Sequence, residues 1–192
     1  MRRVRCLKLL IGITVSWCVS SSVATAEPTV WTGLTYSFVS TVEAPAQDMI
    51  TPDVIFARGT TFGLYNAASE SSYSSNYSPE STLWATEFNN PGANVSANNW
   101  ADLSFTDWQT AYGSAGALSG NIVGSDTVLY LELDDVYLDV RFTQWGNGRM
   151  GDGGSFSYLR AEPIPEPATF ILAAAALLAL GRRRRKSSEI LV

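Results

Sequence analysis

Two adjacent segments of alternating polarity constrain this chain more than any other feature. Residues 127–133 read Thr-Val-Leu-Tyr-Leu-Glu-Leu, and residues 136–142 read Val-Tyr-Leu-Asp-Val-Arg-Phe. Because successive side chains of a strand point to opposite faces, this period of two predicts two strands. Asp134 and Asp135 between them suit a tight turn, so we predict a β-hairpin. In the hairpin, Leu129, Leu131 and Leu133 are expected to share one face.

Other segments extend the β character. A strand is predicted at residues 155–160, after a glycine-rich loop, and earlier strands at 30–39, 54–57 and 120–123. Short strands with turn signals and few helical runs favour a mainly β fold with a single β-sandwich or jelly-roll-like domain. Closure of the sheet into a barrel stays open as an alternative.

Two stretches depart from the strand pattern. Residues 106–109 have the spacing of a capping box with Thr106 at the cap, and Gly113 follows where a short helix would stop. Residues 69–81 are polar and rich in serine, which predicts an exposed loop.

The first 26 residues have the features of a secretory signal peptide. Four cations precede an apolar run at residues 9–19, and Ala24 and Ala26 form a small-x-small cleavage site. The apolar run is too short to span a bilayer. We expect signal peptidase to cleave after Ala26, which leaves residues 27–162 as the exported β domain.

Residue types missing from the exported part exclude several kinds of chemistry. Both cysteines, Cys6 and Cys18, fall in the predicted signal peptide, so the mature chain can form no disulfide and has no thiol nucleophile. The sequence has no His, which excludes serine triads, histidine-ligated zinc and most haem sites. Residues 27–167 contain no Lys, which excludes Schiff-base chemistry.

The charge of the exported part is strongly negative. Residues 27–167 hold 4 Arg against 17 Asp and Glu, a net charge of −13, whereas the whole chain has −5. Phosphate binding relies on Lys and Arg, so this balance disfavours nucleic acid and anionic lipid as partners.

A second apolar run, at residues 168–180, lies near the C-terminus. It is preceded by Pro165, Glu166 and Pro167. At about 1.5 Å per helical residue it covers roughly 20 Å of a roughly 30 Å hydrocarbon core, so we expect a marginal transmembrane helix. Five cations follow, which suit a cytoplasmic stop under the positive-inside rule: Arg182, Arg183, Arg184, Arg185 and Lys186.

This order of features over residues 163–192 resembles the PEP-CTERM sorting signal of bacterial exported proteins. In that family a Pro-Glu-Pro motif, a short transmembrane stretch and a basic cluster follow one another. The resemblance implies recognition by an exosortase, a membrane-embedded cysteine protease that removes the tail. It also implies export, a transient anchor in the inner membrane, and final placement at the cell surface or outside the cell.

The interior is similar to an uncharacterised group of exported bacterial proteins, many of which have the same tail. No activity is established for that group, so the similarity implies that the interior is one domain and implies no mechanism. The residues that carry it are 50–53, 105–109, 135–142, Trp145 and 154–158.

Residues 146–151 match the dinucleotide-binding fingerprint letter for letter. The fingerprint requires a preceding strand and a helix that opens on its last glycine. Here two further glycines and a predicted strand follow, so we predict a hairpin loop and no cofactor.

Five carboxylates of the second half could ligate calcium, which takes six to eight oxygen ligands. No EF-hand spacing is present, and Asp at strand ends commonly forms turns. We therefore expect a solvated acidic rim, with bound calcium as the alternative. The carboxylates are Asp126, Asp134, Asp135, Asp139 and Asp152.

Carbohydrate chemistry could arise in two ways. A glycosidase needs two carboxylates roughly 5–9.5 Å apart, for which Glu132 and Asp139 are candidates. Alternatively, tryptophans could form a sugar-stacking platform, although large aromatic side chains bury about 150–250 Å² each and are mostly expected in the core. The tryptophans of the domain are Trp31, Trp84, Trp100, Trp108 and Trp145.

These observations favour a non-catalytic exported protein with no catalytic residue and no cofactor. We expect an adhesive or structural role in the cell envelope or extracellular matrix, in association with exopolysaccharide. The alternative is a carbohydrate-active hydrolase that uses a carboxylate pair.

Overall fold

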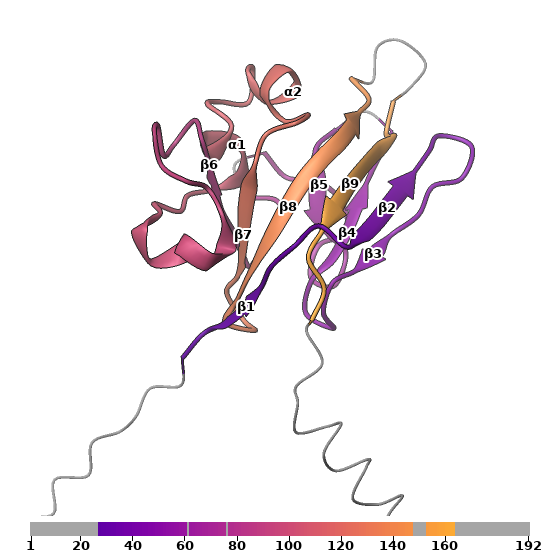
Figure 1. Ribbon diagram of the computed structural model, residues 1–192. Helices are drawn as coiled ribbons and strands as arrows, with labels where there is room; N and C mark the ends of the chain where they lie inside the picture. Colours follow the sequence, from indigo (N-terminus) through magenta and orange to yellow (C-terminus); the bar gives the residue numbers. More distant parts are fainter. Residues whose placement is uncertain (1–26, 61, 76, 148–152, 164–192) are drawn as a thin grey trace, which may run out of the picture.

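A computed structural model describes residues 27–60, 62–75, 77–147 and 153–163 of the chain (Figure 1). These residues form a mainly β domain of two sheets, which confirms the predicted fold class. The predicted signal peptide and sorting helix lie outside the described residues. The strands are β1 (Thr29–Trp31), β2 (Tyr36–Ser40), β3 (Asp48–Met49), β4 (Ile55–Arg58), β5 (Leu64–Asn66), β6 (Thr82–Thr86), β7 (Thr127–Leu131), β8 (Val136–Trp145) and β9 (Phe156–Arg160). The helices are the 3-10 helix η1 (Ala97–Asp102), α1 (Trp108–Ala111) and α2 (Leu118–Asn121).

The larger sheet is built around β8. Its strand order is β2-β9-β8-β7-β6, with antiparallel neighbours, and β1 joins β8 in parallel. β7 pairs along one side of β8, and β1 and β9 share the other side. β1 pairs with the first part of β8, at Val136 to Leu138, and β9 pairs with the part from Val140 to Trp145.

The predicted hairpin of β7 and β8 is confirmed, with Leu131 opposite Val136. Its turn spans residues 132–135 and is longer than the predicted pair of aspartates. Asp135 has a φ of 52°, in the left-handed region that Asp tolerates better than most residues. Because Leu133 falls in this turn, it is 66% exposed and leaves the buried face that Leu129 and Leu131 share.

The smaller sheet has the order β3-β4-β5 and packs against one face of the larger sheet. Phe56 of β4 stacks on Trp84 of β6 with ring centroids 5.7 Å apart, and it contacts Tyr158 of β9 edge-on at 6.4 Å. On the opposite face of the larger sheet, Trp100 of η1 stacks on Tyr137 of β8 at 4.6 Å. The domain is therefore a sandwich with a second, smaller apolar layer under η1.

A buried ion pair joins the two sheets. Asp48 of β3 accepts hydrogen bonds from Arg160 of β9, at 2.8 Å from Nε and 3.1 Å from Nη2, and from the Tyr158 hydroxyl at 2.6 Å. Asp48 is 3% exposed and Arg160 is 5% exposed. Burial, together with the Asp48 carboxylate, raises the pKa of Tyr158 well above its ordinary value. The carboxylate therefore meets two buried donors at the interface between the sheets.

Two predicted strands were wrong in detail. Residues 30–39 contain two strands, β1 and β2, because the chain bends at Gly33, whose φ of 85° favours glycine. Of residues 120–123, the first two end α2, Ile122 is its C-cap, and Val123 forms only an isolated bridge. Leu118 and Ile122 are both buried and lie four residues apart, a spacing that is typical of a helix. The prediction of a strand at residues 120–123 did not take this spacing into account.

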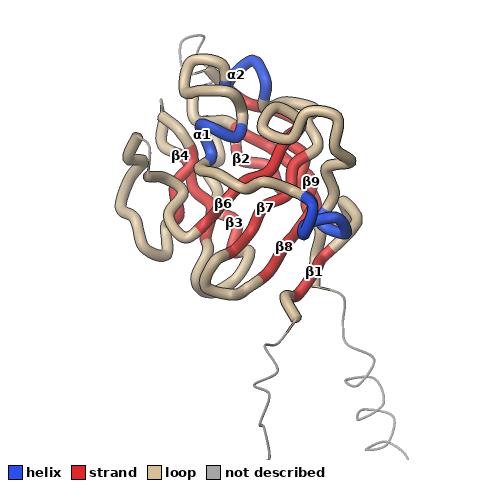
Figure 2. Tube along the Cα trace, turned by 90° about the vertical axis from the view of Figure 1, so that its left-hand side faces the viewer, coloured by secondary structure: helices blue, strands red, loops and turns tan. Residues whose placement is uncertain are grey.

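Both ends of the domain lie at one end of the larger sheet, and α2 lies at the other (Figures 1 and 2). Thr29 of β1 pairs with Val136, the first residue of β8. β9 runs antiparallel to β8 and returns the chain toward that same end. Trp145 ends β8 at the opposite side, next to Phe156 of β9.

Candidate functional site

A groove opens at the end of the domain that carries α2 and the last residue of β8. Its volume of about 570 Å³ falls within the roughly 300–1,000 Å³ that is common for ligand sites. β4, the β4–β5 loop, α1, α2 and β8 all contribute to its walls. The side chains used below are Arg58, Phe62, Tyr73, Trp108, Gln109 and Trp145.

Aromatic rings form much of the groove wall. Phe62 and Tyr73 stack with centroids 6.2 Å apart and an interplanar angle of 11°. Phe62 is 66% exposed, so much of its side chain faces solvent. Trp145 is half-buried and meets the buried Trp108 edge-on at 5.4 Å. Gln109 donates a hydrogen bond from Nε2 to the Tyr73 hydroxyl, which holds that ring in place.

Gly63 allows the rings to approach. A Cβ atom at this position would lie 2.5 Å from Cε2 of Tyr73 and 2.7 Å from Cζ3 of Trp108. Any larger residue would therefore displace one of these rings, so the absence of a side chain here shapes the groove.

Arg58 fixes the position of the groove walls. Its Nε donates to the carbonyl of Phe62 at 2.8 Å, and its Nη1 and Nη2 donate to the carbonyls of Ser155, at 2.7 Å, and Gly146. The guanidinium lies 3.7 Å from the ring centroid of Trp145. A planar guanidinium suits such a fork of acceptors beside an aromatic face. Arg58 thus ties the β4–β5 loop to the ends of β8 and β9.

Helix α1 supplies Trp108 and Gln109 to the groove, and its N-cap is Asp107. The predicted cap, Thr106, is one residue too early, because Thr106 lies in a β-bridge and Asp107 Oδ1 accepts from the backbone N–H of Thr110 at 3.0 Å. The predicted stop at Gly113 is confirmed, with a φ of 95°. The helix therefore begins where a carboxylate satisfies its first free N–H groups.

We expect the substitution Asp107→Ala to lower the free energy of unfolding by about 1 kcal/mol at pH 7. Burial alone raises the pKa of Asp107, but hydrogen bonds from Thr110, Thr106 and Gln109 outweigh burial and lower the pKa. A lowered folded-state pKa means that this stabilisation is present above the unfolded-state pKa and is lost as pH falls through the folded-state value. Urea unfolding at pH 7 and pH 2 measures the change. Asp107→Asn, which caps without a charge, should lose little at pH 7, and an Ala variant as stable as the parent would contradict the cap.

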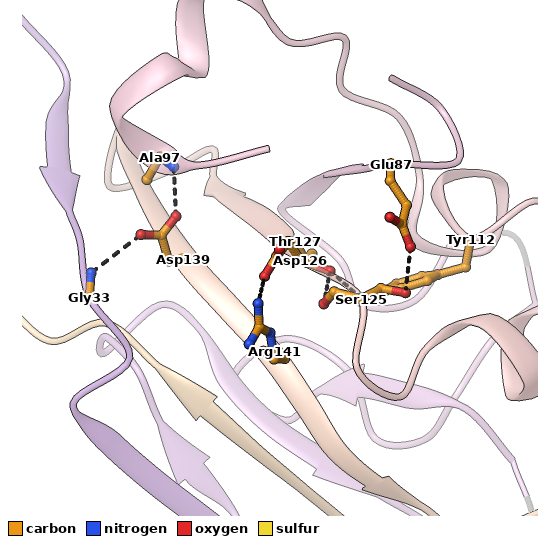
Figure 3. A network of polar contacts seen from close by, with 9 residues as sticks. All are labelled: Gly33, Glu87, Ala97, Tyr112, Ser125, Asp126, Thr127, Asp139 and Arg141. Carbon is orange, nitrogen blue, oxygen red and sulfur yellow. Dashed lines mark hydrogen bonds and ion pairs between the residues drawn. The ribbon is translucent and has the colours of Figure 1, made fainter. Parts of the chain in front are cut away.

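A second polar network surrounds β8 (Figure 3). Asp139 accepts hydrogen bonds from the backbone N–H groups of Ala97, at 2.6 Å, and Gly33, at 3.3 Å. Arg141 pairs with Asp126, and their side chains are 41% and 56% exposed. A depression of about 190 Å³ lies beside these two carboxylates. Asp139 holds η1 and the segment after β1 against the sheet, which is a structural use of the carboxylate.

The candidate calcium ligands are engaged in separate contacts. Asp134 accepts from Thr51 Oγ1 at 2.8 Å, and Asp135 accepts from the Tyr130 hydroxyl at 3.2 Å. Asp152 lies outside the described residues. In the part of the chain that the structure describes, no group of three or more His, Cys, Asp or Glu side chains could hold a metal ion.

We expect calcium chloride, magnesium chloride and sodium chloride at equal ionic strength to raise the melting temperature by similar amounts. Residues 27–167 have a net charge of −13, so their charges repel one another, and salt screens this repulsion. Thermal unfolding followed by circular dichroism compares the three salts. A clearly larger shift in millimolar calcium than in magnesium would reveal a specific calcium site.

The candidate glycosidase pair is not brought together. Val128 lies opposite Asp139 in the hairpin, and Glu132 lies four residues farther along, in the turn. At about 3.3 Å per residue this places Glu132 roughly 13 Å along the strand from that position. This backbone offset is longer than the roughly 5–9.5 Å that separates the two carboxyl groups of a glycosidase.

The tryptophans are mostly in the core, as expected. Trp31, Trp84 and Trp108 are buried, whereas Trp100 and Trp145 are half-buried. Sequence reasoning missed the contribution of Phe62 and placed Tyr73 in an exposed loop. A large apolar residue beside a glycine, in a segment without strand alternation, was the available signal for Phe62.

Of the fingerprint residues, only 146 and 147 are described, and they follow the end of β8. The Gly146 N–H donates to the Ser155 carbonyl at 2.9 Å, and β9 is the next described element. Residues 148–152 lie outside the description. The helix that a dinucleotide fingerprint requires does not follow in the described residues.

The C-terminal segment identifies the class of protein. Residues 163–186 match the PEP-CTERM protein-sorting motif, and β9 ends just before them at Arg160. The chain is therefore an exported protein that carries a PEP-CTERM sorting signal and is a substrate of an exosortase, with a transient membrane anchor. No curated protein and no solved structure matches the chain. The similarity of the interior to an uncharacterised exported group stays a prediction.

The sorting residues predicted from the sequence fall within the matched motif. These are Pro165, Glu166 and Pro167, followed by the basic residues 182–186. They lie outside the described residues, as does the apolar run at 168–180. No helix in the described ranges is long and apolar enough to cross a membrane.

Proposed function

We propose that this chain is a non-catalytic exported protein with an adhesive or structural role in the cell envelope or extracellular matrix, where it associates with exopolysaccharide. Signal peptidase removes residues 1–26, and exosortase separates the domain from the segment that crosses the membrane at residues 168–180. The observation that carries the proposal is the sorting motif, which begins at residue 163, directly after the folded domain. A protein delivered in this way acts outside the cytoplasm as a free or surface-held domain.

The side chains of the groove favour binding over hydrolysis. The described residues that line it include no Asp or Glu, although residues 27–167 contain 17 of them. Glycoside hydrolysis uses a pair of carboxylates, whereas retention of a glycan needs contact surface and hydrogen bonds. The separation of Glu132 from Asp139 along the sheet also favours binding over hydrolysis.

The mature protein is expected to begin at Glu27. Ala24 and Ala26 offer the small side chains that signal peptidase requires at its cleavage site. Mass spectrometry of N-terminal peptides from the processed protein measures this end. Ala26→Arg should block cleavage, whereas Ala26→Ser should preserve it. Processed protein that still carries residues 2–8 would contradict the prediction.

Fractionation of cells tests the matrix role. In cells that possess the exosortase, we expect the domain to sediment with the extracellular polysaccharide, and mild periodate oxidation of that polysaccharide should release it. Cells that lack the exosortase should retain the chain in the membrane fraction. A domain that stays free in the medium, with none in the polysaccharide fraction, would contradict the proposal.

A further inference from the structure

We propose that the groove lined by Phe62, Tyr73 and Trp145 binds a neutral polysaccharide chain through the apolar faces of its sugar rings. This inference rests on the proposed function and names the site and the ligand class that the function would use.

A stacked aromatic pair with an exposed ring lines the groove. Phe62 is 66% exposed although it is a large apolar side chain, and it is stacked on Tyr73 at a centroid distance of 6.2 Å. Stacking and the hydrogen bond from Gln109 to the Tyr73 hydroxyl fix the orientation of this pair. The fold gains no hydrophobic stabilisation from a ring that stays in water. Because the ring pair is already rigid, a ligand that covers it causes little loss of conformational entropy.

Neutral polar groups line the groove together with the rings. Gln109, Ser75, Ser119 and Asn147 line the same groove and bring amide and hydroxyl groups that suit sugar hydroxyls. Trp108 also lines it, and its indole Nε1 is buried without a hydrogen-bond partner in the described part of the chain. A groove with aromatic faces and several neutral polar groups matches a ligand whose rings have apolar faces and hydroxyl edges.

Charge selects a neutral ligand. The exported part has a net charge of −13, so a polyanionic chain is repelled at long range. Arg58, the cation among the described lining residues, donates to three backbone carbonyls and lies over Trp145. Its hydrogen bonds therefore serve the fold and do not present a carboxylate-binding fork to the groove.

The position of the groove suits a ligand outside the cell. α2, which contributes Leu118 and Ser119 to the lining, lies at the opposite end of the domain from β1 and from the two ends of the described residues (Figures 1 and 2). The sorting motif begins three residues after β9, so a membrane anchor attaches at the far end from the groove. The groove is thus open to polysaccharide both before and after exosortase releases the domain.

Titration calorimetry of the full chain in a zwitterionic, sugar-free detergent tests the proposal. The probes are three neutral oligosaccharides, cellohexaose, xylohexaose and mannohexaose, with hexagalacturonate as the acidic comparison. We expect at least one neutral probe to bind and hexagalacturonate not to bind. Phe62→Ala should weaken the binding of that neutral probe about tenfold, since loss of a central aromatic contact commonly has an effect of this size.

Leu133→Ala is the matched control. Leu133 is also 66% exposed, but it lies in the β7–β8 turn, near the end of the sheet that carries the chain termini. Its substitution should leave binding within about twofold of the parent. The inference is overturned if none of the neutral probes binds, if Phe62→Ala and Leu133→Ala bind equally well, or if hexagalacturonate binds more tightly than every neutral probe.

Sorting and binding can be separated experimentally. Phe62→Ala should be processed and released like the parent, because Phe62 lies far from the sorting motif in the sequence. Normal release together with no glycan binding would overturn this inference and leave exosortase sorting intact. If the chain binds glycan but its release does not depend on exosortase, exosortase sorting is overturned and the glycan-binding groove is kept.

Discussion

Asp48→Ala is expected to lower the free energy of unfolding by about 3–5 kcal/mol, the usual range when one partner of a buried ion pair is removed. The substitution leaves Arg160 and the Tyr158 hydroxyl buried without the carboxylate that now accepts from both. Domains of this kind are stable by roughly 5–15 kcal/mol, so the variant should unfold at much lower urea concentration. Tryptophan fluorescence during urea unfolding measures the loss.

Two comparisons make the Asp48 test specific. Asp126→Ala removes the exposed ion pair with Arg141, which should change stability by less than about 1 kcal/mol. The double variant Asp48→Leu with Arg160→Met removes both buried charges and should be more stable than Asp48→Ala alone. If Asp48→Ala costs no more than Asp126→Ala, the buried pair does not hold the two sheets together.

The second large effect concerns sorting. Glu166→Ala, or replacement of Arg182, Arg183, Arg184 and Arg185 by Gln, should leave most of the chain as unprocessed precursor in the membrane fraction. We expect Pro165 and Pro167 to interrupt any helix at the outer membrane face, and the basic block to hold the far end in the cytoplasm. Immunoblots of membrane and medium fractions measure the ratio of precursor to released protein.

Glu162→Ala is the matched control for Glu166→Ala. Glu162 is an exposed acidic residue that directly precedes the matched motif at residues 163–186. It should be released as efficiently as the parent. Replacement of the four arginines by lysines should also preserve processing, because the charge is kept. If Glu166→Ala and the glutamine variant are released like the parent in cells that possess the exosortase, the segment would be an ordinary weak anchor.

The sequence predicted those parts of the fold whose pattern repeats over several residues. The alternation at residues 127–142 was long enough to define β7, β8 and their pairing. The strands β4 and β9, predicted at residues 54–57 and 155–160, are confirmed, but other elements of two to five residues gave no clear period. β3, β5 and β6 were therefore missed, and α2 was taken for a strand although Leu118 and Ile122 have helical spacing.

The candidate site was less predictable than the fold. The sorting motif is contiguous in sequence, so its order of features could be recognised without a structure. The groove instead joins Phe62, Tyr73, Trp108 and Trp145 from four separate segments. Arg58 links the β4–β5 loop of Phe62 to the end of β8 at Trp145, and Gln109 of α1 links Tyr73 to the helix that carries Trp108.

The two ends of the released protein provide the most direct measurement of the central claim, that a folded β domain is exported and then freed from its sorting signal. Intact mass spectrometry should show a chain that begins at Glu27 and ends near Pro165 to Pro167, without residues 168–192. The same strain without exosortase should release little or none of it. Released protein that still ends at Val192, or equal release in both strains, would contradict the claim.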